Sequence, residues 1–335
     1  MIILTCYFLE SMKIIFYFFA LSLIIKSILF ANEDSKYAPG ISLTLRTKAE
    51  QNLSDGNLLF YVRNARFAVR GQLSELISYK AEIDWQDEDE IDMLDAAIIH
   101  FSPVDNFKIS LGQQKQPFSY EYQKNPFEFD FANLNFINKR LSKGLRDIGI
   151  LGEYKTNIGI PATFLLGIFN GNGINKLETD FSKIVSSRID LFLFDSYRFS
   201  VSGAKGRLMQ DEVEMWNIST EYNNKYWHFD TEIAQKKHID KFINYYGFYT
   251  VLGYHTYYDN KYFTKITYAI KWEIYNRDPD EGKESPRRFT AGITFNLPSE
   301  NYQSNIRLDY EKYLYRNNTP SGEDKFTIEF SLRIK

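Results

Sequence analysis

The chain has 335 residues, of which 44% are hydrophobic and 25% charged, and its 43 acidic and 40 basic side chains give a net charge of -3. The mean hydropathy of -0.37 excludes a bundle of transmembrane helices, and a chain without net positive charge lacks the basic footprint of a nucleic-acid-binding protein. Aromatic residues make up 17% of the chain, which is too many for a disordered protein and typical of β-strands.

The first segment of the chain has the pattern of a secretory signal peptide. A basic residue after Met12 precedes an apolar run at 14–25, and the small residue Ala31 follows it. These three features are typical of export signals. We therefore predict a signal peptide over residues 1–31, with Met12 as an alternative start; a buried helix or a membrane anchor are the other interpretations of the run. Cys6 is the only cysteine, so no intramolecular disulfide can form.

From residue 40 onward, short stretches alternate strictly between apolar and polar residues. For example, Ile266, Tyr268, Ile270 and Trp272 alternate with polar or small residues. A period of two predicts β-strands with one apolar and one polar face. Turn-forming residues separate the stretches. Sixteen predicted strands begin near residues 40, 59, 75, 92, 106, 146, 161, 184, 196, 213, 226, 244, 262, 287, 303 and 325.

The pattern favours a closed membrane barrel over a soluble β-sandwich, which shows the same alternation. Sixteen strands are too many for one sandwich, the export signal sends the chain out of the cytoplasm, and the apolar faces carry almost no charge. Aromatic residues also gather at strand ends, as Tyr257 and Tyr258 do, which is typical of the interface girdles of outer-membrane barrels. We predict an all-β fold, a single closed antiparallel transmembrane β-barrel over residues 32–335, with no second domain.

The stretch 116–143 interrupts the alternation. It carries Pro117, Pro126 and a cluster of aromatic residues, and a connection of this length is either functional or disordered. Because aromatic side chains are costly to leave in water, we predict that the stretch folds into the barrel, packs against the wall and narrows the lumen as a constriction loop.

Several short motifs occur along the chain in a fixed order: RNARF at 63–67, FKISLGQQKQPFSYE at 107–121, NKR at 138–140, RDIG at 146–149, GIFNG at 167–171 and EMW at 214–216 followed by Tyr222. Together they resemble the motifs of the phosphate-selective porin O and P family. The resemblance implies a trimer of sixteen-stranded outer-membrane barrels, each with its own pore narrowed by an inward-folded loop. The chain departs from the family pattern at Asn64, which replaces an arginine, and at Lys335, where outer-membrane barrels usually have an aromatic residue.

Charged residues on and around the irregular stretch are candidates for lining the pore. Strand alternation turns Arg66, Arg70 and Lys108 into the lumen, because their neighbours are apolar. Rings of charge at the narrowest point of a pore set its ion selectivity. The basic candidates are Arg66, Arg70, Lys108, Lys115, Arg140, Lys143 and Arg146, with Lys139 beside them; the acidic candidates are Glu121, Glu128, Asp130 and Asp147. Either a basic track faces acidic residues across the constriction, or these residues solvate the lumen and form ion pairs that hold the loop to the wall.

Motifs for catalysis or metal binding are not evident. The four histidines lack metal-ligand spacing, so we expect no metal site and no cofactor. His228 alternates with Trp227 and Phe229 and therefore points into the lumen, without the serine partner that a barrel hydrolase needs. The acidic run at 87–90 is interpreted as a solvated loop, with a divalent-cation site as the alternative.

The predicted function is that of an outer-membrane porin of a Gram-negative cell, a channel and not an enzyme. We expect it to contact outer-membrane lipid, to form a homotrimer, to bind no nucleic acid and to pass small anionic or neutral solutes by passive diffusion. A preference for anions such as phosphate is left open. The alternatives are a substrate-specific channel with a binding site at the loop, a structural or adhesive barrel with a closed lumen, and a barrel-embedded hydrolase.

Overall fold

The computed structural model describes residues 37–85, 94–176, 181–277, 286–299, 302–314 and 324–334. The predicted signal peptide and the acidic run at 87–90 lie outside these residues. In the part of the chain that the structure describes, no helix has the length and apolarity needed to cross a membrane.

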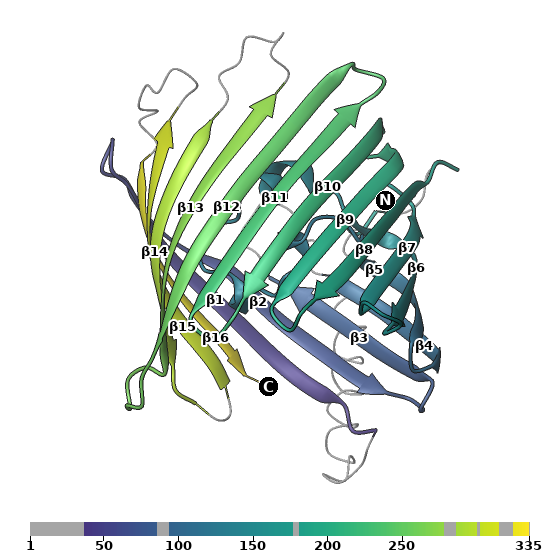
Figure 1. Cartoon of the computed structure of the whole chain (residues 1–335), viewed down its shortest axis with the longest axis horizontal. Helices are drawn as coiled ribbons and strands as arrows, with labels where there is room; N and C mark the ends of the chain where they lie inside the picture. Colours follow the sequence, from purple (N-terminus) through teal and green to yellow (C-terminus); the bar gives the residue numbers. More distant parts are fainter. Residues whose placement is uncertain are drawn as a thin grey trace, which may run out of the picture.

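Sixteen antiparallel strands form one closed barrel, which confirms the predicted fold (Figure 1). Each strand pairs with its neighbours in sequence, and β1 pairs with β16 to close the ring. The observed strands begin within three residues of the predicted starts. Their bounds are β1 Gly40–Asn52, β2 Leu58–Gln72, β3 Ile77–Asp84, β4 Leu94–Val104, β5 Phe107–Lys115, β6 Arg146–Thr156, β7 Ala162–Phe169, β8 Ile184–Leu193, β9 Tyr197–Leu208, β10 Asp211–Asn223, β11 Trp227–His238, β12 Ile243–Tyr257, β13 Lys265–Arg277, β14 Arg287–Leu297, β15 Tyr302–Leu314 and β16 Lys325–Ile334.

Strand β13 shows how the alternation produces two different faces. Tyr268 and Ile270 on the outer face are 41% and 48% exposed, whereas Lys271 and Glu273 on the inner face are 1% and 0% exposed. An apolar outer face and a polar lumen are what a membrane barrel requires. One residue of the predicted outer set differs, because Ile266 is buried; it lies opposite Phe295 of β14.

The two ends of the barrel differ in the length of their connections. At the end where β1 begins, called here the turn end, strands are joined by short connections such as 105–106 and 194–196. The opposite end, called the loop end, carries the connection 116–145 between β5 and β6. Outer-membrane barrels have short periplasmic turns and longer extracellular loops, so this asymmetry matches theirs.

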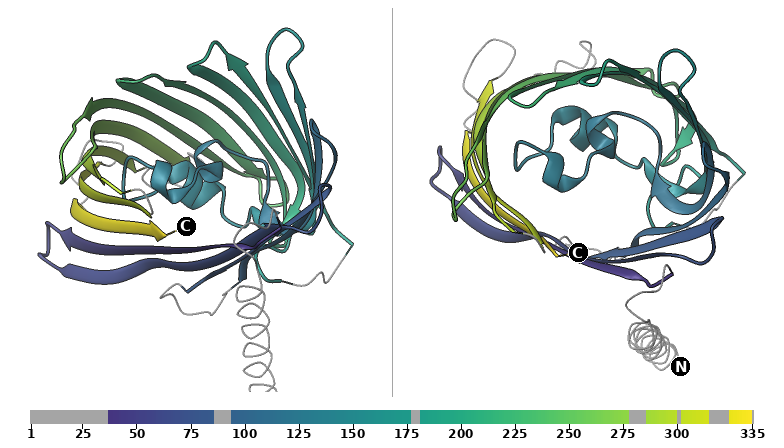
Figure 2. Two further views of the ribbon diagram at one scale, coloured as in Figure 1. Left: turned by 90° about the horizontal axis from the view of Figure 1, so that it is seen from below. Right: turned by 60° about the horizontal axis from the view of Figure 1, so that its bottom comes forward.

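The main apolar cluster lies inside the barrel. Figure 2 shows the chain between β5 and β6 within the ring of strands. Its apolar side chains are almost fully buried against small and aromatic residues of the wall. The cluster includes Phe118, Phe131, Phe136, Ile137, Leu141 and Leu145 from this connection and Met215, Ala234, Tyr249 and Val251 from the strands.

Candidate pore constriction

Residues 116–145, called here the lumen segment, contain three short helical turns. These are η1 Glu121–Gln123, η2 Pro126–Glu128 and the π-helical turn η3 Ile137–Leu141. Asn125 caps η2 by accepting a hydrogen bond from the backbone of Phe127 at 3.1 Å, and Glu128 accepts one from the backbone of Asn125 at 3.2 Å. The irregular sequence therefore has local order of its own.

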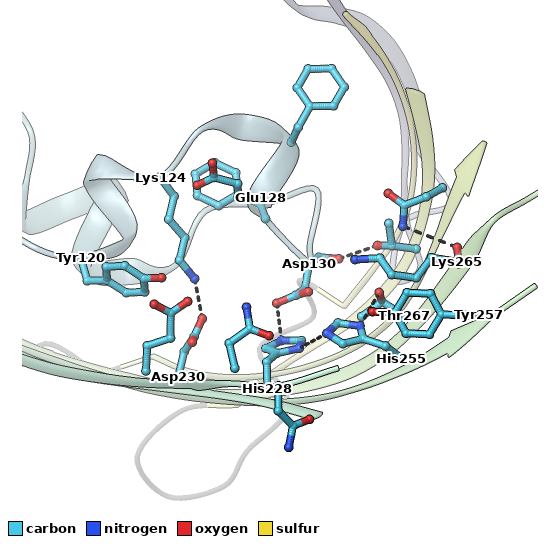
Figure 3. Close-up of a pocket in the computed structure, with 17 residues that line it drawn as sticks. Tyr120, Lys124, Glu128, Asp130, His228, Asp230, His255, Tyr257, Lys265 and Thr267 are labelled. Carbon is cyan, nitrogen blue, oxygen red and sulfur yellow. Dashed lines mark hydrogen bonds and ion pairs between the residues drawn. The ribbon is translucent and has the colours of Figure 1, made fainter. Parts of the chain in front are cut away.

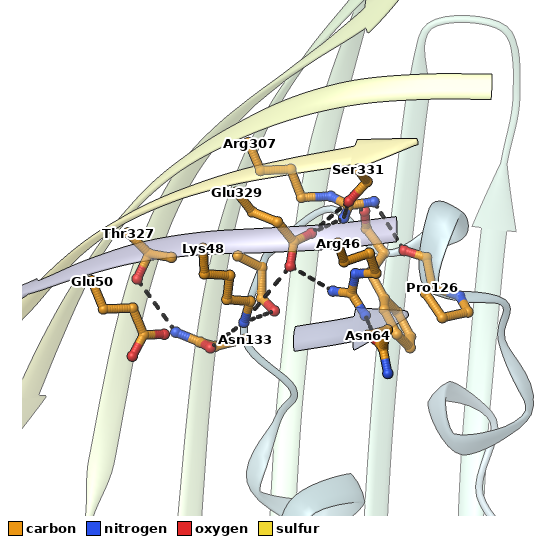
Figure 4. A network of polar contacts seen from close by, with 12 residues as sticks. Arg46, Lys48, Glu50, Asn64, Pro126, Asn133, Arg307, Thr327, Glu329 and Ser331 are labelled. Carbon is orange, nitrogen blue, oxygen red and sulfur yellow. Dashed lines mark hydrogen bonds and ion pairs between the residues drawn. The ribbon is translucent and has the colours of Figure 1, made fainter. Parts of the chain in front are cut away.

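Cationic side chains of the wall bind carbonyl oxygens of the lumen segment. Arg307 on β15 is fully buried and donates to the carbonyls of Phe129 at 3.0 Å and Pro126 at 2.9 Å (Figure 4). Three more contacts of this kind run from Lys48 to Ala132 at 2.6 Å, from Arg288 to Leu134 at 2.6 Å and from Lys271 to Asn133 at 3.4 Å. These four cations of the wall are engaged in holding the segment.

Carboxylates of the same wall bind backbone N–H groups of the segment. Asp309 accepts a hydrogen bond from Ala132 at 2.6 Å, and Glu273 accepts one from Phe136 at 3.0 Å. Hydrogen bonds to charged groups contribute about 1.5–3 kcal/mol each, roughly twice the neutral value. Cations of the wall thus bind carbonyl oxygens of the segment, and carboxylates of the wall bind its N–H groups. These contacts replace the β-sheet hydrogen bonds that the segment does not form.

Glu329 on β16 connects cations of β1 and β15, on either side of it, at the strand pair that closes the barrel. Its carboxylate forms ion pairs with Arg46 at 2.7 Å, with Lys48 at 3.7 Å and with Arg307. Glu329 and Arg307 are completely buried. Because a buried charge needs a compensating partner, removing Glu329 would deprive all three cations of their shared carboxylate.

A polar pocket of about 420 Å³ opens between the segment and the wall near the turn end (Figure 3). A chain of hydrogen bonds crosses one side of it. Asp130 Oδ2 lies 2.8 Å from His228 Nε2, His228 Nδ1 lies 3.1 Å from His255 Nε2, and His255 Nδ1 lies 2.9 Å from Thr267 Oγ1. The two histidines, far apart in sequence, therefore connect the segment to β11, β12 and β13.

The other side of the pocket is formed around Tyr120. Its ring lies between two cations, with Lys124 Nζ at 4.3 Å and Arg198 Cζ at 3.7 Å from the ring centroid. Lys124 also forms an ion pair with Asp230 on β11 at 2.5 Å. Cation–π contacts and this ion pair fix η1 against the wall.

Two of the predicted basic residues are neutralised by acidic residues of the wall. Arg66 lies 2.7 Å from Asp84, and Arg146 lies 3.0 Å from Asp95. They do not face the acidic residues of the lumen segment. Arg66 and Arg146 therefore do not form a basic track opposite those acidic residues.

The other predicted basic residues of the strands have different surroundings. Lys108 forms an ion pair with Glu153 at 3.0 Å, and Arg70 is exposed at the end of β2. Lys115, at the end of β5, donates to the carbonyl of Tyr122 at 2.6 Å. Lys115 therefore supports the base of the lumen segment.

Cations with no ion-pair partner among the described residues occur on and just after η3. Lys139, Arg140 and Lys143 are exposed, and Arg140 lies 4.9 Å from the ring of Tyr275. The apolar residue Ile137 on the same turn is 1% exposed. The turn thus buries an apolar side against the wall while its cations stay exposed.

The predicted acidic residues bind groups within or next to the segment. Glu121 accepts hydrogen bonds from the backbone of Asn135 and the side chain of Asn138, both at 3.4 Å. Asp147 is fully buried and accepts from the backbone of Gly171. With Glu128 capping η2 and Asp130 bound to His228, these contacts match the interpretation in which charges hold the loop in place.

Burial shifts the ionisation of two acidic groups of the segment. It raises the pKa of Glu121 to about 7, an effect that the neighbouring Lys271 opposes and Glu232 reinforces. Burial also acts to raise the pKa of Asp130, but the hydrogen bond from His228 and the charges of His228, Lys124 and Arg307 together outweigh it and leave that pKa lowered. Glu121 is therefore the less easily ionised of the two.

Sequence reasoning missed the wall charges that hold the segment. They had a detectable signal, because Lys271 and Glu273 share the polar face of β13, and Arg307, Asp309 and Glu311 share that of β15. Among these, the backbone atoms bound by Lys271, Glu273, Arg307 and Asp309 lie more than a hundred residues away, which no local pattern reveals.

Similarities to known proteins agree with this geometry. Solved structures with the same fold include the loop L8 deletion mutant of OmpT, an outer membrane protein of Vibrio cholerae (12% identity, TM-score 0.64, covering 90% of this chain and 99% of that one). The outer membrane channel DcaP of Acinetobacter baumannii is similar at 10% identity and a TM-score of 0.59, covering 91% and 99%. The anion-selective porin from Comamonas acidovorans is similar at 12% identity and a TM-score of 0.58, covering 88% and 98%. The fold is that of a sixteen-stranded porin.

Residues 44–173 match the family model of phosphate-selective porin O and P. The resemblance predicted from the motifs is confirmed over this part of the chain, which includes the whole lumen segment. A search of curated proteins gave no match.

Proposed function

We propose that this protein is an outer-membrane porin through which small solutes diffuse passively, and that the lumen segment is its constriction. The observation that carries the proposal is the way the segment is bound. It crosses the barrel and is held on the far wall by charged side chains such as Arg307 and Asp309. A segment fixed in this way reduces the cross-section of the lumen permanently, which is how a channel limits the size of its solutes.

The preference for anions is the finer part of the proposal, and the cations of η3 support it. Arg140 and Lys143 are exposed and without ion pairs to described residues, whereas the charges of Arg66 and Arg146 are balanced by carboxylates. Unbalanced positive charge in a low-dielectric channel raises the local concentration of anions. We therefore assign anion selectivity to η3 and the residues just after it rather than to the strands.

We further propose that the chain is exported by the signal peptide at 1–31, resides in the outer membrane with its outer face against lipid, and assembles as a homotrimer. The exposed apolar residues on the outer faces of the strands support the membrane location. Mass spectrometry of the mature protein should find an N-terminus near residue 32, and native mass measurements should find three copies. A mature protein that retains residues 13–30 would contradict the export proposal.

A substrate-specific channel is the second candidate, and the turn-end pocket is the observation that favours it. This pocket, with Lys124, Asp130 and His255 among its lining residues, is large enough for a small solute. Flux that saturates with solute concentration would indicate binding there. Flux that rises linearly would indicate simple diffusion.

The constriction is tested by deleting residues 122–137 and recording single channels in planar bilayers. We expect a larger conductance than that of the wild type, since the lumen of a sixteen-stranded barrel is otherwise open to water. Heat-modifiable mobility on gels should first establish that the deleted variant forms a barrel. An unchanged conductance in a folded barrel would show that the segment is not the constriction.

A further inference from the structure

Two lumen-facing positions of the wall beneath the segment carry no side chain. Gly247 lies on β12 between Tyr245 and Tyr249, and Gly292 lies on β14 between Thr290 and Thr294. Neither glycine has the positive φ that would require this residue. Glycine inside a strand costs stability and commonly marks a close approach by another part of the molecule. Space, rather than backbone conformation, explains these two glycines.

The space at Gly247 is filled by η3. A Cβ atom at this position would lie 2.5 Å from Cγ1 of Ile137 and 2.9 Å from Cδ1 of Leu141. Real Cβ atoms do not approach other carbons so closely, so a larger residue would force the side chains of Ile137 and Leu141 to shift, and a leucine, which needs more room, would displace η3 with them. Ala234 of β11, the cross-strand neighbour of Gly247, is itself small and completely buried.

The space at Gly292 is filled by Phe131. A Cβ atom there would lie 3.0 Å from two atoms of the Phe131 ring and 2.5 Å from Oδ1 of Asp309. Asp309 is the carboxylate that binds the backbone of Ala132, the next residue of the segment. The absence of a side chain at Gly292 therefore leaves room for the Phe131 ring and for the hydrogen bond between Ala132 and Asp309 beside it.

We propose that Gly247 and Gly292 are positioning residues of the constriction: they set how closely the lumen segment lies against the wall and thereby the width of the remaining pore. This inference rests on the proposed function, because it assigns a consequence for conduction to the docking of the segment. Since Ile137 of η3 is buried against the wall while Arg140 and Lys143 are exposed, displacing η3 from the wall carries these cations further into the solute path.

The test enlarges a residue of the wall and then truncates the residue of the segment that it contacts. Gly247→Leu should push η3 into the lumen and lower single-channel conductance roughly 1.5-fold, because conductance follows pore cross-section. Adding Ile137→Ala to this variant vacates the space for the new side chain and should restore the wild-type value. Gly152→Leu is the control, because a Cβ atom at Gly152 has only ordinary contacts, the nearest at 3.7 Å. If the leucine variant does not assemble, Gly247→Ala is compared with and without Ile137→Ala in the same way, and a smaller loss of conductance is expected.

The position of the segment is measured separately from conduction. Spin labels at Lys143→Cys in the segment and Lys205→Cys on the outside of β9, with Cys6→Ser, report the distance between segment and wall. A distance that changes in Gly247→Leu and returns in the double variant, with conductance following it, supports the proposal. An unchanged distance in a folded Gly247→Leu barrel overturns it. A distance that changes and returns while conductance stays constant would uphold the positioning role and refute the proposed constriction.

Discussion

Replacing Arg307 by Met should release one part of the lumen segment without unfolding the barrel. The guanidinium donates two hydrogen bonds to the segment, to Phe129 at 3.0 Å and to Pro126 at 2.9 Å. At about 1.5–3 kcal/mol for each bond from a charged donor, the substitution weakens docking by roughly 3–6 kcal/mol. Glu329 keeps Arg46 at 2.7 Å, so its charge remains compensated. Methionine retains the apolar part of the side chain, which limits the cavity.

Single-channel recordings and limited proteolysis are the assays for this prediction. We expect the variant to show noisy currents with transient closures, since η2 can then leave the wall, and faster cleavage within residues 122–132. Arg207→Met is the matched control, because Arg207 is an exposed arginine that donates to the carbonyl of Gln210 in a turn at the loop end. If Arg307→Met leaves current noise and cleavage at wild-type levels, the cation–carbonyl contacts do not hold the segment.

Three further predictions concern the outer face, selectivity and pH. Ile270→Arg places a charge on the lipid-facing side near mid-strand and should lower the free energy of unfolding in lipid vesicles by about 2–4 kcal/mol; a change under 1 kcal/mol would mean that this face is not in lipid. Arg140→Gln should shift the reversal potential in a salt gradient toward cations, less so at high salt, whereas Arg146→Gln combined with Asp95→Asn, which removes a balanced ion pair, should shift it little. Because burial raises the pKa of Glu121 to about 7, from an unfolded value near 4.5, its ionisation destabilises the docked segment increasingly as pH rises between these values. Glu121→Gln should abolish that component of the pH dependence of proteolysis, and an unaltered profile would contradict it.

The strands could be predicted from the sequence because period-two alternation is a local property. In β13 and β14 every second residue is apolar, so the faces follow from the pattern and the first residues follow to within three positions. The lumen segment was identifiable for another reason, since it carries two prolines and many aromatic residues in a connection too long for a hairpin. A segment that is apolar without being a strand needs a surface on which to bury those residues.

The partners of individual charges could not be predicted in the same way. Arg66 meets Asp84 because the register of β2 against β3 places them opposite each other, and alternation does not specify register. Lys48 meets Ala132 across the lumen, at a separation of 84 residues. The histidine contact between β11 and β12 likewise depends on register, so the sequence indicated the direction of His228 but not its partners.

The buried cluster around Glu329 has a consequence for the order in which the molecule can be built. Lys48 lies on the first strand, Glu329 on the last and Arg307 on the strand before it, so the binding surface for the middle of the lumen segment spans the seam where the barrel closes. That surface does not exist until the two ends of the sheet have joined. Residues 126–132, made long before the last strand, must therefore wait for it. This part of the constriction therefore forms after the barrel has closed, whereas the η3 surface on β11 and β12 does not involve the seam.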